Sequence, residues 1–221
     1  SRLFIPGRNS SPLPGIPQGL QAKWEHPKAV ERSINITERI AARVLNHKDI
    51  LFNFESRLQT LFYRVAVLPS LHCGVIPSDS LTVSGDGTAV HTHANPHGKH
   101  TKEQLASLSP EELSFAPRHY SDPDARWGWD SGLDQYYFGY TLFQLSCYNP
   151  SLRTDVPLLL RFTSAKRHDS VCFLTAFHEM EKHMPSLSVK NMCLDSAMDN
   201  MPTYRLLKKR GIRAFIDLNS K

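Results

Sequence analysis

The spacing of hydrophobic residues divides the chain into an N-terminal helical part and a later part that mixes strands with helices. Over residues 27–46 and 48–67, apolar side chains recur every three or four positions, which predicts two helices packed as a hairpin. Residues 80–93 instead alternate apolar with polar side chains and are rich in Thr and Val, which predicts a strand. The periodicity therefore changes near residue 80.

Strands and helices alternate in the C-terminal half of the chain. The pattern predicts strands over residues 136–148, 156–163, 189–194 and 212–218, and helices over residues 170–183 and 201–211. Early strands followed by β-α-β crossovers indicate a mixed α/β sheet with flanking helices. In such sheets, binding sites form at the carboxyl ends of strands.

These changes of pattern divide the chain into three parts. We expect an irregular segment rich in Pro and Gly over residues 1–24, a helical segment over residues 25–70 and an α/β core over residues 78–221. A polar stretch around residues 95–124 is interpreted as an insertion into the core. The helical segment is a candidate for DNA binding or for assembly, and the sequence leaves that choice open.

Composition adds a mild preference for a polyanionic partner. The 221 residues are 40% hydrophobic, enough for a sizeable core, and carry a formal net charge of +5. An ordinary basic protein explains this charge equally well.

The four cysteines form no CxxC pair, which argues against a disulfide framework or a thiolate zinc site. Since no apolar run is long enough to cross a bilayer, we expect a cytoplasmic protein without a membrane partner.

Two aspartates are the main candidates for chemistry. Asp86 lies between two glycines inside the strand predicted for residues 80–93, and Asp195 directly follows the strand predicted for residues 189–194. An unpaired carboxylate on a core strand is costly, and a shared Mg²⁺ or Mn²⁺ centre would lower that cost. The alternative is that the Gly-Asp-Gly segment is a tight turn and that Asp195 caps a helix. Spacing alone favours this alternative.

Further polar side chains are candidates for binding. Lys166, Arg167 and His168 follow a predicted strand, where they are placed to contact substrate phosphate. A basic turn in which Ser170 caps the next helix explains them equally well. Asp199 is an alternative acid, and it is also a natural N-cap for the helix of residues 201–211.

The aromatic and histidine clusters have simple structural explanations. Trp127, Trp129 and other aromatic residues around Asp130 can stack on unpaired bases, but packing against the sheet is favoured. Four histidines within ten residues offer imidazole ligands for zinc. No cysteine accompanies them, which favours a solvated loop. They are His91, His93, His97 and His100.

Four segments, taken in order, resemble the DDE transposases of bacterial insertion sequences. They are SGDGTAV, RWGWDSGLDQYYFGYTLFQLS, RFTSAKRHDSVCFLTAFHEM and CLDSAMDNMPTYRLLKKRGIRAFIDLN, all within residues 80–221. The resemblance implies a ribonuclease-H-like fold, with Asp86 as the first catalytic acid and Asp195 as the second. It places Asp199 at the position where the next helix begins. The third acid of the family, a Glu on a later helix, has no match, so we expect a core that is incomplete at its C-terminus.

The resemblance also implies metal-dependent DNA cleavage and strand transfer. Asp86 and Asp195 would be ligands of two Mg²⁺ or Mn²⁺ ions in the complete site, and the basic turn of residues 166–168 would neutralise phosphate charge. The implied partners are element ends and target DNA, with a homo-oligomer as a further expectation, in the bacterial cytoplasm at the nucleoid. Two alternatives stay open: a non-catalytic DNA-binding remnant, and a metal-dependent nuclease on the same fold. Without the third acid, the sequence leaves enzymatic activity undecided.

Overall fold

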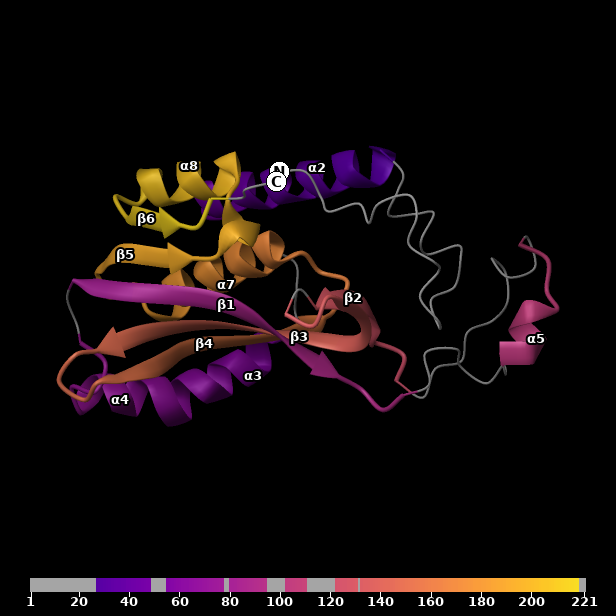
Figure 1. Cartoon of the computed structure of the whole chain (residues 1–221). Coiled ribbons are helices and arrows are strands. Elements are labelled where there is room, and N and C mark those ends of the chain that lie inside the picture. Colours follow the sequence, from indigo (N-terminus) through magenta and orange to yellow (C-terminus); the bar gives the residue numbers. More distant parts are fainter. Residues whose placement is uncertain are drawn as a thin grey trace.

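A six-stranded mixed sheet organises the structure, which is a computed structural model (Figure 1). It describes residues 27–48, 55–77, 80–94, 102–110, 122–130 and 132–218. The strands are β1 (Leu81–His91), β2 (Arg126–Asp130), β3 (Gln135–Asn149), β4 (Thr154–Ser164), β5 (Val189–Leu194) and β6 (Arg213–Ile216).

Strand β1 lies where the sheet changes from antiparallel to parallel. The order is β2-β3-β1-β5-β6, with β4 pairing β3 in addition. Strand β3 is antiparallel to β1, β2 and β4, whereas β5 is parallel to both β1 and β6. The two parallel connections contain α7 (Asp169–His183) and α8 (Met201–Lys209). The predicted mixed α/β sheet with flanking helices is therefore confirmed.

Strand β1 passes through the Gly-Asp-Gly segment without turning. It pairs continuously with β3 from Val83, opposite Cys147, to His91, opposite Gly139. The tight-turn interpretation of Asp86 is therefore wrong. Close packing explains glycine here without a turn, because a Cβ atom on Gly85 would lie 2.9 Å from side-chain atoms of both Leu145 and Leu194.

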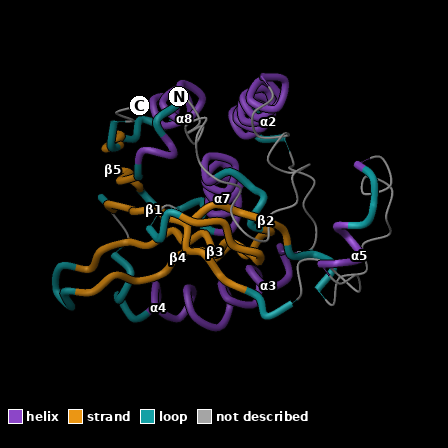
Figure 2. Tube along the Cα trace, turned by 45° about the vertical axis from the view of Figure 1, so that its right-hand side comes forward, coloured by secondary structure: helices purple, strands orange, loops and turns teal. Residues whose placement is uncertain are grey.

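Helices cover both faces of the sheet (Figures 1 and 2). Helix α7 packs on β1, β3 and β4, and α2 (Pro27–Leu45) packs against α7 and α8. On the opposite face lie α3 (Glu55–Phe62), η1 (Tyr63–Val67) and α4 (Leu68–His72). The two N-terminal helices expected to form a hairpin are thus separated by the sheet, because each buries its apolar stripe against a different layer.

The N-terminal helices share one hydrophobic core with the sheet. Ile40 and Val44 of α2, Val67 of η1 and Phe177 of α7 belong to the same buried cluster. Val44 and Phe143 have 0% of their surface exposed, so α2 and β3 both contribute fully buried side chains. Because the side chains of α2 and of the sheet are buried in the same core, the position of α2 relative to the sheet is fixed.

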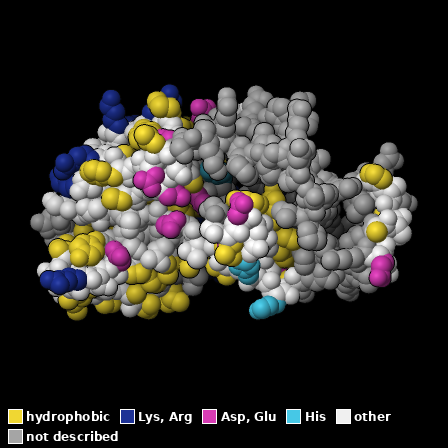
Figure 3. All heavy atoms as spheres, viewed as in Figure 1, with side chains coloured by type: hydrophobic (Ala, Val, Ile, Leu, Met, Phe, Trp, Pro, Cys, Tyr) yellow, Lys and Arg dark blue, Asp and Glu magenta, His cyan; other side chains and the backbone are white. Residues whose placement is uncertain are grey.

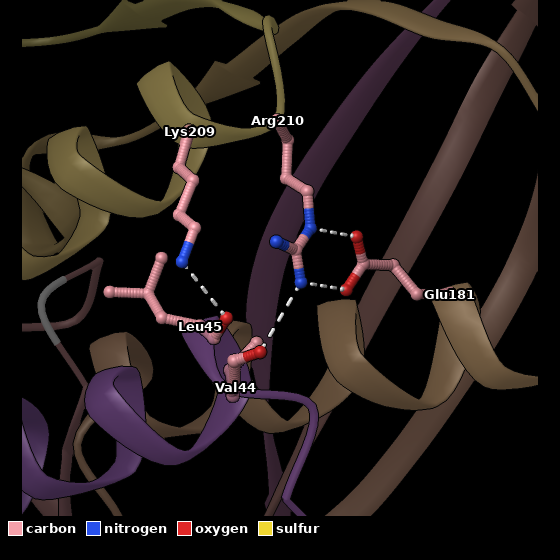
Figure 4. A network of polar contacts seen from close by, with 5 residues as sticks. All are labelled: Val44, Leu45, Glu181, Lys209 and Arg210. Atoms are coloured by element: carbon pink, nitrogen blue, oxygen red, sulfur yellow. Dashed lines mark hydrogen bonds and ion pairs between the residues drawn. The ribbon is translucent and has the colours of Figure 1, made fainter.

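A polar network also attaches α2 to the C-terminal helices (Figure 4). Arg210, which ends α8, donates to both carboxylate oxygens of Glu181 on α7, and its Nη2 lies 3.2 Å from the Val44 carbonyl oxygen. Lys209 Nζ lies 3.4 Å from the Leu45 carbonyl oxygen. Two cationic side chains therefore donate to carbonyl groups at the C-terminal end of α2, where the Val44 carbonyl also accepts the His47 amide at 3.1 Å.

The predicted polar insertion is only partly described. Its helix α5 (Lys102–Ala106) stands apart from the sheet in both ribbon views. Residues 95–101 and 111–121, with His97 and His100, lie outside the described residues, as does the irregular segment 1–24. Within the described part of the chain, the helices are too short or too polar to span a membrane.

Candidate acidic site

The parallel pairing of β1 with β5 brings Asp86 and Asp195 to the same region of the sheet. Gly85 is opposite Leu194 in the register, so the two aspartates occupy the next positions on neighbouring strands. Strand alternation places Asp86 on the exposed face of β1, opposite to the face of the buried Gly85. Acidic side chains gather over this part of the surface in Figure 3.

Asp195 combines a capping role with electrostatic contact to other acids. Its Oδ1 accepts a hydrogen bond from the Ala197 amide at 3.1 Å and so caps η2 (Ser196–Met198). Burial raises the pKa of Asp195, the hydrogen bond from Ala197 opposes this rise, and repulsion from Asp86 and Asp217 adds to it. The capping interpretation is therefore confirmed for a short 3₁₀ helix, and it is compatible with a role beside Asp86.

Asp169, the first residue of α7, is a third acid in this region. A Cβ atom on Gly87 would lie 2.8 Å from Asp169 Oδ1, so the carboxylate approaches β1 at a position without a side chain. Burial raises the pKa of Asp169 to about 6, and repulsion from Asp195 and Asp86 contributes. In the sequence, Asp169 lies in a turn that was interpreted only as basic. Its position directly between a predicted strand and a predicted helix is the signal that could have identified it as a site residue.

Asp217 adds a fourth carboxylate at the same edge. Its backbone N–H donates to the Leu194 carbonyl at 3.2 Å, which continues the pairing of β5 with β6 by one residue. Its charge is one of the causes that raise the pKa of Asp195. Asp217 was not among the predicted site residues, because the sequence does not show that β6 pairs with β5.

The donor chemistry of Asp86 and Asp195 fits a hard divalent cation. Mg²⁺ prefers carboxylate oxygens and often takes only one or two of them, together with water and substrate phosphate. The raised pKa of Asp195 reflects burial and repulsion between acids, which a bound cation would relieve. Within the described ranges, no three His, Cys, Asp or Glu side chains form a ready metal-binding group. The fit therefore rests on two protein carboxylates.

The predicted basic residues follow β4 at the start of α7. Lys166 and His168 are exposed, and the Arg167 amide donates to the Ser164 carbonyl at 3.0 Å. A Cβ atom on Gly128 would lie 2.7 Å from both Cβ and the carbonyl oxygen of Ala165, so this turn packs closely on β2. The turn of residues 166–168 directly precedes Asp169 in the chain, and the neighbouring Ala165 holds it against β2.

Two predicted helix caps are wrong. The N-cap of α8 is Asn200, whose Oδ1 accepts from the Thr203 amide at 3.1 Å, while Asp199 accepts a hydrogen bond from Tyr204 Oη. The N-cap of α7 is His168, whose Nδ1 accepts from the Ser170 amide at 3.3 Å. In both cases the N-cap is the residue with extended backbone just before the helix. It lies one residue after the predicted Asp199 and two residues before the predicted Ser170.

The aromatic cluster packs as a hairpin beyond the acidic region. Trp127 contacts Phe138, and Trp129 contacts Tyr136, with ring centroids 5.6 Å and 4.8 Å apart. These contacts cross the antiparallel pair β2–β3, which supports the packing interpretation. Asp130 Oδ1 accepts the Gly132 amide at 2.9 Å, in agreement with a turn role.

His91, one of the four clustered histidines, has protein partners of its own. His91 packs on Tyr137, with ring centroids 5.0 Å apart, and its Nε2 lies 3.9 Å from Asp130 Oδ2. These contacts explain His91 without a metal ion.

No family model matches the chain, and no curated protein and no solved structure is significantly similar to it.

Proposed function

We propose that this chain is the catalytic core of a DDE transposase with a ribonuclease-H-like fold, in which Asp86 and Asp195 are metal ligands. The observation that carries the proposal is that Asp86 and Asp195 directly follow Gly85 and Leu194, the last residues paired between the parallel strands β1 and β5. Asp169 and Asp217 surround the same region with further negative charge. A concentration of acids on paired core strands is costly unless a cation is shared among them.

The order of the elements supports the fold assigned in this proposal. Antiparallel strands lie on one side of β1, and the parallel strands β5 and β6, joined by α8, lie on the other. Asp86 belongs to β1, and Asp195 directly follows β5. That arrangement is compatible with the ribonuclease-H-like sheet that the sequence resemblance implies. It also follows the general rule that α/β sheets bind ligands at the carboxyl ends of their strands.

In the proposed reaction, the protein holds and neutralises a DNA phosphodiester. Mg²⁺ or Mn²⁺ ions, when bound, would supply activation of the attacking oxygen and stabilisation of the leaving oxygen. Asp86, fixed by the pairing of β1, and Asp195, fixed as the cap of η2, would hold them. Lys166 and Arg167 neutralise phosphate charge beside the acids, and His168, whose Nδ1 accepts the Ser170 amide, can donate only from its Nε2. The partners are element ends and target DNA, bound by a homo-oligomer in the bacterial cytoplasm.

One observation favours a second candidate function, a non-catalytic DNA-binding remnant. In the part of the chain that the structure describes, the acids do not form a group of three ligands. A remnant would retain the basic surface and the fold, and it would bind DNA without breaking it. The two candidates differ in a single measurable property, which is cleavage.

Cleavage and joining of a labelled element end with Mn²⁺ tests the proposal. We expect slow cleavage and strand transfer by the parent chain, slow because no residue matches the third acid of the family, and loss of both in Asp86→Asn and Asp195→Asn. Asp155→Asn is the matched control, because Asp155 is an exposed acid near the start of β4 and should leave activity unchanged. Cleavage without joining would favour the nuclease, and DNA binding without cleavage would favour the remnant.

A further inference from the structure

A buried hydroxyl connects the start of α7 with the turn that carries Asp195. Ser170 is 3% exposed, and its Oγ lies 2.7 Å from the Ala197 carbonyl oxygen. A carbonyl oxygen can only accept, and a serine hydroxyl has one proton, so this proton points to Ala197. The amide of the same residue, Ala197, donates to Asp195 Oδ1. The backbone of Ala197 is thus held through its carbonyl by Ser170 and through its amide by the Asp195 carboxylate.

The Ser170 oxygen also connects to the start of α8. Asn200 Nδ2 donates to Ser170 Oγ at 3.2 Å, while Asn200 Oδ1 accepts from the Thr203 amide and caps α8. His168 Nδ1 lies 3.0 Å from the same oxygen, but it accepts the Ser170 amide and the hydroxyl proton points to Ala197, so this contact adds no hydrogen bond. The Ser170 side chain therefore joins three segments: the start of α7, to which it belongs, the η2 turn after β5 and the cap of α8.

We propose that Ser170 is a positioning residue that fixes the Asp195 turn relative to Asp169 and β1. The inference rests on the proposed function for the role of Asp195, but the positioning itself is a property of the fold. Removing the hydroxyl leaves the half-buried Ala197 carbonyl and Asn200 side-chain amide without this partner. The η2 turn would then be free to move, and Asp195 with it.

A second buried hydroxyl on the same helix provides a matched control. Thr175 is also 3% exposed, and its Oγ1 donates to the Val171 and Cys172 carbonyls at 2.9 Å and 3.0 Å. These bonds stay within α7, so Thr175→Val removes a buried hydroxyl without touching the Asp195 turn. Ser170→Ala removes one that bridges three segments. Comparing the two variants separates positioning from a general loss of stability.

Amide hydrogen exchange of the full chain tests this inference without metal or DNA. In Ser170→Ala we expect exchange at Ala197 and Met198 to accelerate roughly tenfold, as for the loss of about one hydrogen bond, with no acceleration there in Thr175→Val. Equal exchange at Ala197 in the two variants would overturn the inference. Where Ser170→Ala does not fold, Ser170→Cys keeps the volume with a weaker donor, and we expect a smaller acceleration at the same amides.

Binding of Mn²⁺ alone then connects the positioning to the proposed function. We expect Ser170→Ala to bind Mn²⁺ at least about fivefold more weakly than Thr175→Val, because the Asp195 carboxylate is less well fixed. Failure of the parent chain to bind Mn²⁺ would contradict the proposed function while the exchange result still decides the role of Ser170. Faster exchange with unchanged Mn²⁺ affinity would overturn the link between Ser170 and the metal site.

Discussion

The Asp169 carboxylate occupies the space beside β1 that a side chain at Gly87 would otherwise fill, with Oδ1 2.8 Å from the Cβ position of that glycine. This approach makes Gly87 sensitive to substitution. We expect Gly87→Ala to lower the free energy of unfolding by about 1–3 kcal/mol, the usual cost of overpacking. Urea denaturation measures the change, and Gly132→Ala, whose added Cβ atom would lie 3.3 Å from Asp130 Oδ1 in an exposed turn, is a milder steric control with a smaller expected loss. If Asp169→Ala fails to relieve the loss in a double variant, the steric cause is wrong.

The pKa of Asp169 predicts an unusual dependence of stability on pH. Because this pKa is raised from 3.8 to about 6, the folded chain binds the proton more tightly than the unfolded chain. Stability contributed by protonated Asp169 is therefore complete below about pH 4 and is lost as the pH rises through about 6.

Asp169→Asn should remove this dependence in the absence of divalent metal. The variant should match the parent at pH 4 and exceed it at pH 7 by at most about 3 kcal/mol, and by less where water screens the carboxylate. Urea denaturation at several pH values in chelator measures the difference. A difference that is the same at pH 4 and pH 7 would contradict the electrostatic explanation.

The Arg210–Glu181 contact predicts that α2 depends on the end of α8. The two side chains are 15% and 25% exposed, and Arg210 also donates to the Val44 carbonyl. We expect Arg210→Met to cost about 1–3 kcal/mol, below the cost of breaking a fully buried pair. Hydrogen exchange should accelerate in the last turn of α2. Lys208→Ala, on the exposed face of α8, should change neither quantity, and equal effects of the two variants would exclude a special role for Arg210.

The basic turn predicts a salt-dependent contribution to DNA binding. Lys166 is exposed directly after β4, so Lys166→Ala should weaken binding to duplex DNA irrespective of sequence. The slope of log affinity against log salt should fall by about 0.9 for the one phosphate contact removed. Lys190→Ala, exposed at the start of β5, is the control. An unchanged slope in Lys166→Ala would remove Lys166 from the DNA surface.

The regular elements could be predicted because each carries its own periodicity. Strand β5 and helix α7 begin and end within a residue of their predicted limits, since apolar runs and helical spacing are local properties. Strand β2 was missed, although Arg126–Asp130 alternates, because Trp127 and Trp129 were interpreted only as a cluster. The separation of α2 from α3 was also missed, because periodicity does not tell which face of a sheet a helix covers.

Half of the acidic region could be predicted, for a related reason. Asp86 and Asp195 stand out in the sequence because each adjoins an apolar strand. Asp169 and Asp217 enter the region only through pairing and packing between segments far apart in the chain. Ser170 looked like an ordinary cap, and its bond to Ala197 depends on where α7 meets the turn after β5. Tertiary contacts of this kind leave no mark on local spacing.

A crystal structure with bound Mn²⁺ tests the metal site most directly, because the anomalous signal locates the ion without reference to activity. We expect a peak that contacts carboxylate oxygens of both Asp86 and Asp195, at roughly the 2.0–2.6 Å typical of hard cations with oxygen ligands. The peak should disappear in Asp86→Asn and persist in Asp155→Asn. A chain that folds normally but shows no Mn²⁺ between Asp86 and Asp195, or binds it elsewhere, would contradict the assignment of these two residues as metal ligands.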